Sequence, residues 1–171
     1  WVRAHPGHVV ISYINCSAAV KALSDVIVTS SSAEAILRQL PDPIVFAPDR
    51  NLAAWLEKKL ERKFVVWPGT CVVHETFSEK RIVDLMVRNP GARLVAHPEC
   101  DERILAHAHF VGSTSALLKH VAESDHASFI VATEEGILHQ MRRAAPGKEL
   151  IAAPPDDGCS CNSCPHMKRN T

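Results

Sequence analysis

Three cysteines lie close together near the end of the chain and could bind a metal. They are Cys159, Cys161 and Cys164. Thiolates are soft ligands that suit iron and zinc. Gly158 and Pro165 flank the group and disfavour a regular helix or strand, so the thiols can turn toward one centre. This tail therefore predicts a metal site.

The spacing of the tail cysteines leaves three interpretations open. The pattern C-x-C-x-x-C-x-H can hold a tetrahedral zinc with His166 as the fourth ligand. Cys159 and Cys161 could instead form a thiol redox pair without a metal. In the third interpretation, the tail cysteines bind a metal together with a distant cysteine, Cys71. Cys71 follows Trp67-Pro68-Gly69-Thr70. The elements between residues 71 and 159 decide whether these thiols can meet.

Composition and charge narrow the class of protein. The chain has 171 residues and is 46% hydrophobic, which is enough for one ordinary domain or two small ones. The chain has 19 Lys and Arg residues and 19 Asp and Glu residues, so it has no excess of positive charge. Binding to nucleic acid or to an anionic membrane is therefore not expected. No membrane-spanning run or signal peptide is recognisable, and six cysteines in that context favour thiol or metal chemistry over disulfides. We expect a cytoplasmic globular protein with small-molecule partners.

Short apolar runs alternate with helical patterns along the chain. Strands are predicted at 8–13, 26–28, 44–46, 64–67, 93–96, 110–111, 129–132 and 150–153. Helices are predicted at 17–23, 33–40, 52–60 and 78–88. This alternation predicts an α/β fold of parallel βαβ units, in three αβα layers with helices on both faces of each sheet.

The second half of the chain repeats the first. Tyr13 ends the first strand, and His97 ends its counterpart 84 positions later (97 − 13). The serines after Val28 are matched by Ser113 and Thr114, and Cys71 follows its unit as the tail cysteines follow theirs. An internal repeat explains these matches and predicts pseudo-symmetric units. The predicted boundaries are 7–70, 71–157 and a cysteine-containing tail at 158–171.

The repeat favours a metal site shared by Cys71 and the tail cysteines. Symmetry-related units that meet at one point would bring Cys71 and the tail thiols together. One repeat further back, another cysteine would lie before Trp1. Three thiolates, one from each repeat, suit an iron–sulfur cluster that leaves one iron open.

Polar side chains follow several predicted strands at their carboxyl ends, where parallel α/β sheets bind ligands. They are Tyr13, Asn15, Thr29, Ser30, His97, Glu99, Ser113 and Thr114. Taken singly, a Ser or Thr at such a position is more often a helix cap than a ligand group. Together the side chains predict a polar pocket.

Seven sequence blocks together resemble the quinolinate synthase family, iron–sulfur enzymes of NAD biosynthesis in bacteria and plants. The blocks are 13–22, 28–33, 67–75, 97–99, 111–115, 131–136 and 164–168. They run in family order over nearly the whole chain. The resemblance implies three pseudo-symmetric α/β domains with the active site at their junction. Residues 7–70 and 71–157 would be the second and third domains.

The resemblance also implies an activity. The family condenses iminoaspartate with dihydroxyacetone phosphate and releases phosphate and water to give quinolinate. A [4Fe–4S] cluster, held by three cysteines from the three domains, acts as a Lewis acid through its open iron. L-aspartate oxidase is the expected upstream partner.

The motifs assign the cluster ligands by resemblance. Cys71 would be the second ligand and Cys164 the third. Cys159 and Cys161 would lie beside the cluster and could form a disulfide that tunes activity. The spacing C-x-C-x-x-C differs from the C-x-x-C-x-x-C of some relatives, so Cys161 stays a weaker ligand candidate.

The resemblance predicts three catalytic residues. Glu99 resembles the family's catalytic glutamate, which would move protons during isomerisation and dehydration. Tyr13 would assist proton transfer. His97 would donate charge-assisted hydrogen bonds to anionic substrate groups.

Other residues are predicted to bind substrate. Asn15 would grip a carboxylate or hydroxyl, and His74 would bind an anionic group. Ser30, Ser113 and Thr114 would bind carboxylate or phosphate near helix N-termini. The complete predicted substrate set is Tyr13, Asn15, Ser30, His74, His97, Glu99, Ser113 and Thr114.

The same comparison predicts that the chain is a fragment. The family's first domain, with the first cluster cysteine and a further histidine, would precede Trp1, and the polar run 168–171 ends without a closing element. We therefore expect the chain alone to be inactive.

Overall fold

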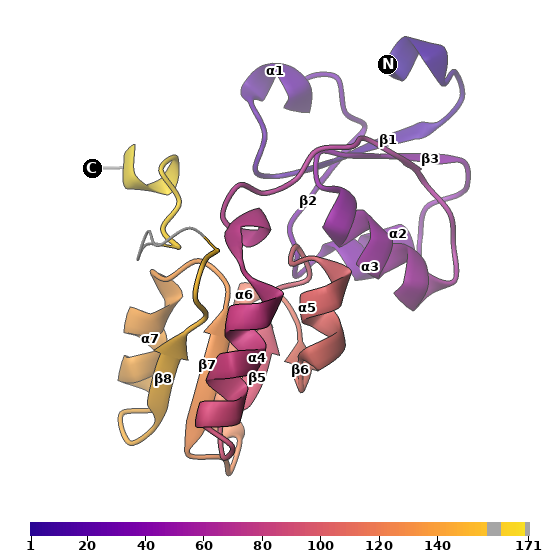
Figure 1. The fold of residues 1–171 in the computed structure, drawn as a ribbon. Helices are drawn as coiled ribbons and strands as arrows, with labels where there is room; N and C mark the ends of the chain where they lie inside the picture. Colours follow the sequence, from indigo (N-terminus) through magenta and orange to yellow (C-terminus); the bar gives the residue numbers. More distant parts are fainter. Residues whose placement is uncertain (157–161, 170–171) are drawn as a thin grey trace. The chain divides into compact units, whose positions relative to one another are not determined.

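A computed structural model describes residues 1–156 and 162–169 of the chain. The chain divides into two compact units, Trp1–Thr70 and Cys71–Thr171. Each unit contains a four-stranded sheet with every strand parallel to its neighbours (Figure 1). The predicted α/β class is confirmed. The assignment of these units to the second and third domains of a family stays a prediction.

The first unit builds its sheet in the order β2-β1-β3-β4. The strands are β1 Val9–Tyr13, β2 Val26–Val28, β3 Ile44–Ala47 and β4 Val65–Val66. The helices are a 3₁₀ turn at Val2–Ala4, α1 Ala18–Lys21, α2 Ala33–Leu37 and α3 Arg50–Leu60. Short β-branched runs form the strands because branched side chains pack well on a pleated surface.

The second unit repeats this arrangement in the order β6-β5-β7-β8. Its strands are β5 Arg93–Ala96, β6 Phe110–Val111, β7 Ser128–Ala132 and β8 Glu149–Ala152. Its helices are α4 Glu79–Arg88, α5 Glu102–His107, α6 Thr114–Glu123 and α7 Ile137–Ala144, with 3₁₀ turns at His74–Thr76 and Met167–Arg169. The identical strand order confirms the internal repeat. Among the described residues, no helix has both the length and the apolar character required to cross a membrane.

The buried residues differ between the two sheets. In the second unit, Leu94 and Ile130 belong to one core cluster and Val95 and Phe129 to another, so both faces of the sheet carry a core. The first unit has one such cluster among its described residues, in which Ile11 packs with residues of α2 and α3. Val10 and Val45, which alternate with Ile11 and Phe46 along β1 and β3, are also buried, so the first sheet has buried residues on both faces too.

Strand register places the following loops at one edge of each sheet. Tyr13 pairs with Val28 in the first sheet, and Ala96 pairs with both Val111 and Ala132 in the second. The residues after these positions therefore leave their sheet at its carboxyl edge. In a parallel sheet, this edge is where ligands bind.

Asp49 stabilises the start of α3 by capping it. Its Oδ1 accepts a hydrogen bond from the Leu52 backbone N at 2.7 Å, and the residue is only 3% exposed. Asp49→Ala should lower the free energy of unfolding of the first unit by about 1–2 kcal/mol, because the buried N–H loses its acceptor. Urea denaturation followed by tryptophan fluorescence will measure this, since Trp55 lies on α3. Asp49→Asn retains an acceptor and should cost less; an equal loss would contradict the capping role.

Candidate active site

The loop after β5 places a buried histidine and glutamate at the carboxyl edge of the second sheet. The His97 N donates to the Ala132 O at 3.0 Å, which ties the loop to β7, and the Cys100 N donates to the His97 O at 3.0 Å. His97 and Glu99 are each 2% exposed. Backbone hydrogen bonds therefore fix the loop that carries these two buried side chains.

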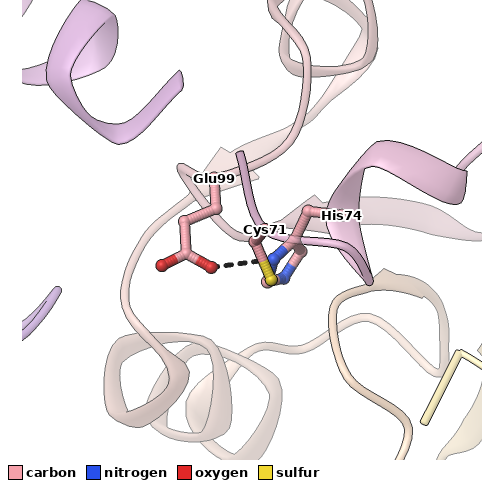
Figure 2. Close-up of side chains that lie close together, drawn as sticks. All are labelled: Cys71, His74 and Glu99. Carbon is pink, nitrogen blue, oxygen red and sulfur yellow. Dashed lines mark ion pairs between the residues drawn. The ribbon is translucent and has the colours of Figure 1, made fainter. Parts of the chain in front are cut away.

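A turn at the start of the second unit brings Cys71 and His74 to the same place. The Glu75 N donates to the Cys71 O at 3.0 Å, which closes the turn. His74 forms an ion pair with Glu99, with Nδ1 2.8 Å from Oε2 (Figure 2). The other ring nitrogen, Nε2, lies 3.2 Å from the Thr133 Oγ1.

Cys71, His74 and Glu99 together form a set of metal donors. One ligand atom of each lies within 4.8 Å of the others. The thiol of Cys71 is half-buried, whereas His74 and Glu99 are buried. These side chains could bind one cation or act on a ligand held beside the thiol.

The two histidines of the site have opposite charge preferences. Burial disfavours the imidazolium of His74, but interactions with the thiol of Cys71 and the carboxylate of Glu99 outweigh burial and raise the pKa of His74 to about 9. Burial and the repulsion from His74 lower the pKa of His97 to about 4, despite the opposing attraction of Glu99. The two rings stack, with centroids 4.8 Å apart and planes 17° apart.

Backbone geometry agrees with a neutral His97. Its Nδ1 accepts a hydrogen bond from the backbone N of Glu99, with the two nitrogens 3.3 Å apart. The proton of the neutral ring is then on Nε2, which can donate to an acceptor in the site. The cationic His74 keeps Glu99 in its carboxylate form, so an unprotonated oxygen is present to accept a proton or a hydrogen bond. The site therefore combines a proton acceptor, a neutral donor and a thiol.

Cys164 reaches the loop after β7 from the tail. Its backbone N donates to the Glu134 Oε1 at 3.2 Å. Glu134 follows Thr133, which contacts His74, so the neighbour of Cys71 in the donor group and the peptide of Cys164 bond to adjacent residues of one loop. Cys164 is half-buried. Cys159 and Cys161, and with them the predicted disulfide, the four-ligand zinc site and the redox pair, lie outside the described residues.

The hydroxyls after β6 have different surroundings. The Ser113 Oγ accepts a hydrogen bond from the Ala116 N at 3.3 Å and caps α6, and Ser113 is 9% exposed. Thr114, the first residue of α6, is exposed. Ser113 thus has the helix-cap role typical of a serine here.

The predicted residues of the first unit gather at the carboxyl edge of their own sheet. Tyr13 ends β1 and is buried, Asn15 in the following loop is exposed, and Ser30 after β2 is half-buried. Next to Ser30, the Thr29 Oγ1 lies 2.9 Å from the Ser31 Oγ. The structure therefore brings these three residues to one sheet edge.

The remaining cysteines of the described chain have other settings. Cys16 lies half-buried in the loop after β1. Cys100 is fully buried, and its Sγ donates to the Ala132 O at 3.4 Å. Cys100 is thus a packing residue of the second unit.

Sequence reasoning missed two contributors, Thr133 and Glu134. Thr133 contacts His74, and Glu134 contacts Cys164. Both belong to the block 131–136, and their position just past β7 was the available signal. Their partners, however, lie far away in sequence.

The whole chain is similar in sequence to proteins of one known family. A family model described as "Quinolinate synthetase A protein" matches residues 1–171. The chain is 56% identical over 170 residues to quinolinate synthase of Nostoc punctiforme, covering 98% of this chain and 52% of that protein. It is 55% identical over 170 residues to quinolinate synthase of Trichormus variabilis, with 98% and 52% covered. It is 54% identical over 171 residues to quinolinate synthase of a Synechococcus strain, with 98% and 53% covered. The chain thus spans about half the length of these curated relatives.

Proposed function

The chain belongs to the quinolinate synthetase A family, and from this premise we propose that it forms part of a quinolinate synthase. The proposed reaction condenses iminoaspartate with dihydroxyacetone phosphate to give quinolinate, phosphate and water. The observation that carries the proposal is the buried Glu99 carboxylate, held against His74 and His97 beside the thiol of Cys71. Buried histidines with shifted pKa values, such as His74 and His97, are typical of catalytic sites.

We propose a [4Fe–4S] cluster as the cofactor, with Cys71 and Cys164 as two of its ligands. Both are half-buried thiols, and thiolates suit iron: Cys71 lies in the donor group with His74 and Glu99, and the Cys164 N is bonded to Glu134 in the loop after β7. The thiol of Cys100, in contrast, is buried in packing. The third thiolate would come from a segment outside this chain. When bound, the cluster would supply a Lewis acid at its open iron.

Glu99 has the central proton-transfer role in this proposal. His74 favours the carboxylate form of Glu99 through their 2.8 Å ion pair, which readies Glu99 to take a proton from substrate. His97, as a neutral ring, would donate from Nε2 to a substrate carboxylate or carbonyl. The buried setting excludes water and strengthens both interactions.

The remaining predicted residues are proposed to bind and orient substrate. In the first unit, Tyr13 would assist proton transfer, and Asn15 and Ser30 would bind polar groups. In the second unit, Ser113 and Thr114 at the start of α6 would bind carboxylate or phosphate. We also propose cytoplasmic localisation, with L-aspartate oxidase as the upstream enzyme that supplies iminoaspartate.

A single divalent cation is the competing occupant of the site. Cys71, His74 and Glu99 offer sulfur, nitrogen and oxygen ligands within 4.8 Å of one another, a combination that zinc accepts. Metal content distinguishes a cluster from a single cation.

The test uses this chain extended to the relatives' length with the remaining segments of the Nostoc punctiforme protein, here called the extended chain. After anaerobic reconstitution with iron and sulfide, it should bind about four irons and four sulfides and form quinolinate. Cys71→Ser and Cys164→Ser should each lower bound iron by at least half, because each removes a thiolate ligand. Cys16→Ser, a half-buried cysteine of the first unit, is the matched control and should retain full iron. One zinc per chain without sulfide would refute the cluster.

A further inference from the structure

Glu134 connects the loop after β7 to the peptide of Cys164. Its Oε1 accepts a hydrogen bond from the Cys164 N at 3.2 Å. Its Oε2 accepts one from the Gly136 N at 2.8 Å. One carboxylate thus binds two backbone N–H groups that belong to distant segments of the chain. Such bonds are stronger than those between neutral groups because the acceptor is charged.

Gly136 leaves room for this carboxylate. A Cβ built on Gly136 would lie 2.7 Å from the Glu134 Oε2, too close for any real contact. The backbone at Gly136 has φ −59°, which every residue adopts readily, so the backbone conformation does not require glycine. A Cβ at this position would instead displace the flexible carboxylate end of Glu134. Gly136 and Glu134 therefore form one local arrangement.

A second connection fixes the tail two residues earlier. The Glu135 N donates to the Asn162 O at 3.2 Å, and the Asn162 Nδ2 donates to the Ala153 O just past β8. Asn162 is 4% exposed, so it is part of the buried structure. With residue 162 tied in this way, the Glu134 contact sets the direction of the backbone at Cys164.

We propose that Glu134 is a positioning residue for Cys164, holding its peptide at the loop after β7, whose Thr133 also contacts His74. The metal-binding consequence rests on the proposed function, in which Cys164 is a cluster ligand. The positioning itself does not require a metal, because both contacts exist between protein groups alone. Neither the repeat nor the spacing of the cysteines assigns this role to Glu134.

The first experiment measures the contact in the metal-free extended chain. Glu134→Gln leaves a single neutral acceptor for two N–H groups, so amide hydrogen exchange at residues 136 and 162–164 should accelerate about tenfold or more. Glu135→Gln is the matched control: it removes the same charge one residue away and leaves the backbone N that contacts Asn162. It should leave exchange in these segments unchanged.

Gly136→Ala displaces the carboxylate without removing its charge. The new methyl should push the flexible end of Glu134 aside and accelerate exchange at 162–164, as Glu134→Ala does. In a Glu134→Ala background, Gly136→Ala should add little, because the group that it displaces is gone. Full additivity of the two changes would overturn the proposed arrangement, as would unchanged exchange at 162–164 in both single variants.

The second experiment measures the consequence for the metal. In the reconstituted extended chain, Glu134→Ala and Gly136→Ala should each speed loss of iron to a chelator several-fold and change the electron paramagnetic resonance spectrum of the reduced cluster. Glu135→Gln should retain both properties. Accelerated exchange with unaltered iron release and spectrum would overturn the positioning role toward the metal. Failure of the unsubstituted extended chain to bind any cluster would instead refute the proposed function, and the exchange results would still decide whether Glu134 positions Cys164.

Discussion

Replacing Glu99 by Gln should lower kcat/KM of the extended chain by about 10²–10⁴-fold, the usual contribution of a general acid–base group. The amide is nearly the same size as the carboxylate but cannot accept a proton at neutral pH. Glu99 is buried and lies 2.8 Å from the His74 Nδ1, so no water reaches it easily to take over proton transfer. Steady-state formation of quinolinate is the measurement.

Two controls make the Glu99 result specific. Iron and sulfide content must match the unsubstituted chain, so that a lost cluster is not mistaken for lost proton transfer. Glu102→Gln changes an exposed carboxylate at the start of α5, three residues further on, and should retain normal turnover. Unchanged kcat/KM in Glu99→Gln with an intact cluster would remove Glu99 from the proposed mechanism.

Replacing Phe129 by Ala should destabilise the second unit by about 3–5 kcal/mol. Phe129 lies on β7, has no exposed surface and belongs to a core cluster with Val95 and Leu117. The Lys148 Nζ lies 5.5 Å from its ring centroid, an additional interaction that the alanine removes. Because natural domains are stable by only about 5–15 kcal/mol, this loss leaves the second unit marginally folded.

The two units can be followed separately in one denaturant titration. All three tryptophans, Trp1, Trp55 and Trp67, lie in the first unit, so their fluorescence reports that unit. Alkylation of the buried Cys100 reports unfolding of the second. Phe129→Ala should move the alkylation midpoint by far more than Val87→Ala, a residue of α4 that is 74% exposed. Equal midpoints for the two variants would contradict the packing argument.

Most of the fold could be predicted because its signals are local. Each strand is a short run with at least one β-branched residue, and the first four helices have recognisable patterns or caps. The later helices α5, α6 and α7 were expected only from the repeat. The helix expected at 33–40 ends earlier, since α2 stops at Leu37. This segment instead ends in a turn with bonds from the Gln39 N to the Ile36 O and from the Leu40 N to the Leu37 O, because Pro41 has no N–H to continue the helical pattern. The guanidinium of Arg62 then donates to the carbonyl oxygens of Leu37 and Leu40. No local pattern reveals a partner 25 residues away.

The candidate site was predictable only in part, for the same reason. Glu99 and His97 could be predicted because they follow a strand, and parallel sheets bind ligands at the carboxyl ends of their strands. His74 was predicted from the family resemblance alone. The contact of His74 with Thr133 joins residues 59 positions apart, and that of Glu134 with Cys164 joins residues 30 apart. Such pairs depend on which strands are neighbours, and the order β6-β5-β7-β8 is not the order of the sequence. A Thr and a Glu in a loop carry no further signal.

The confinement of every strand pairing to its own unit has a consequence during protein synthesis. In the part of the chain that the structure describes, β1 to β4 pair only with one another, and so do β5 to β8. At about 5–20 residues per second, Thr70 is added about 5–20 s before Thr171. The first sheet can therefore close on the ribosome while the partners of β5 are still being translated. Sequential closure lowers the chance that a strand of one sheet pairs wrongly with the equivalent strand of its repeat.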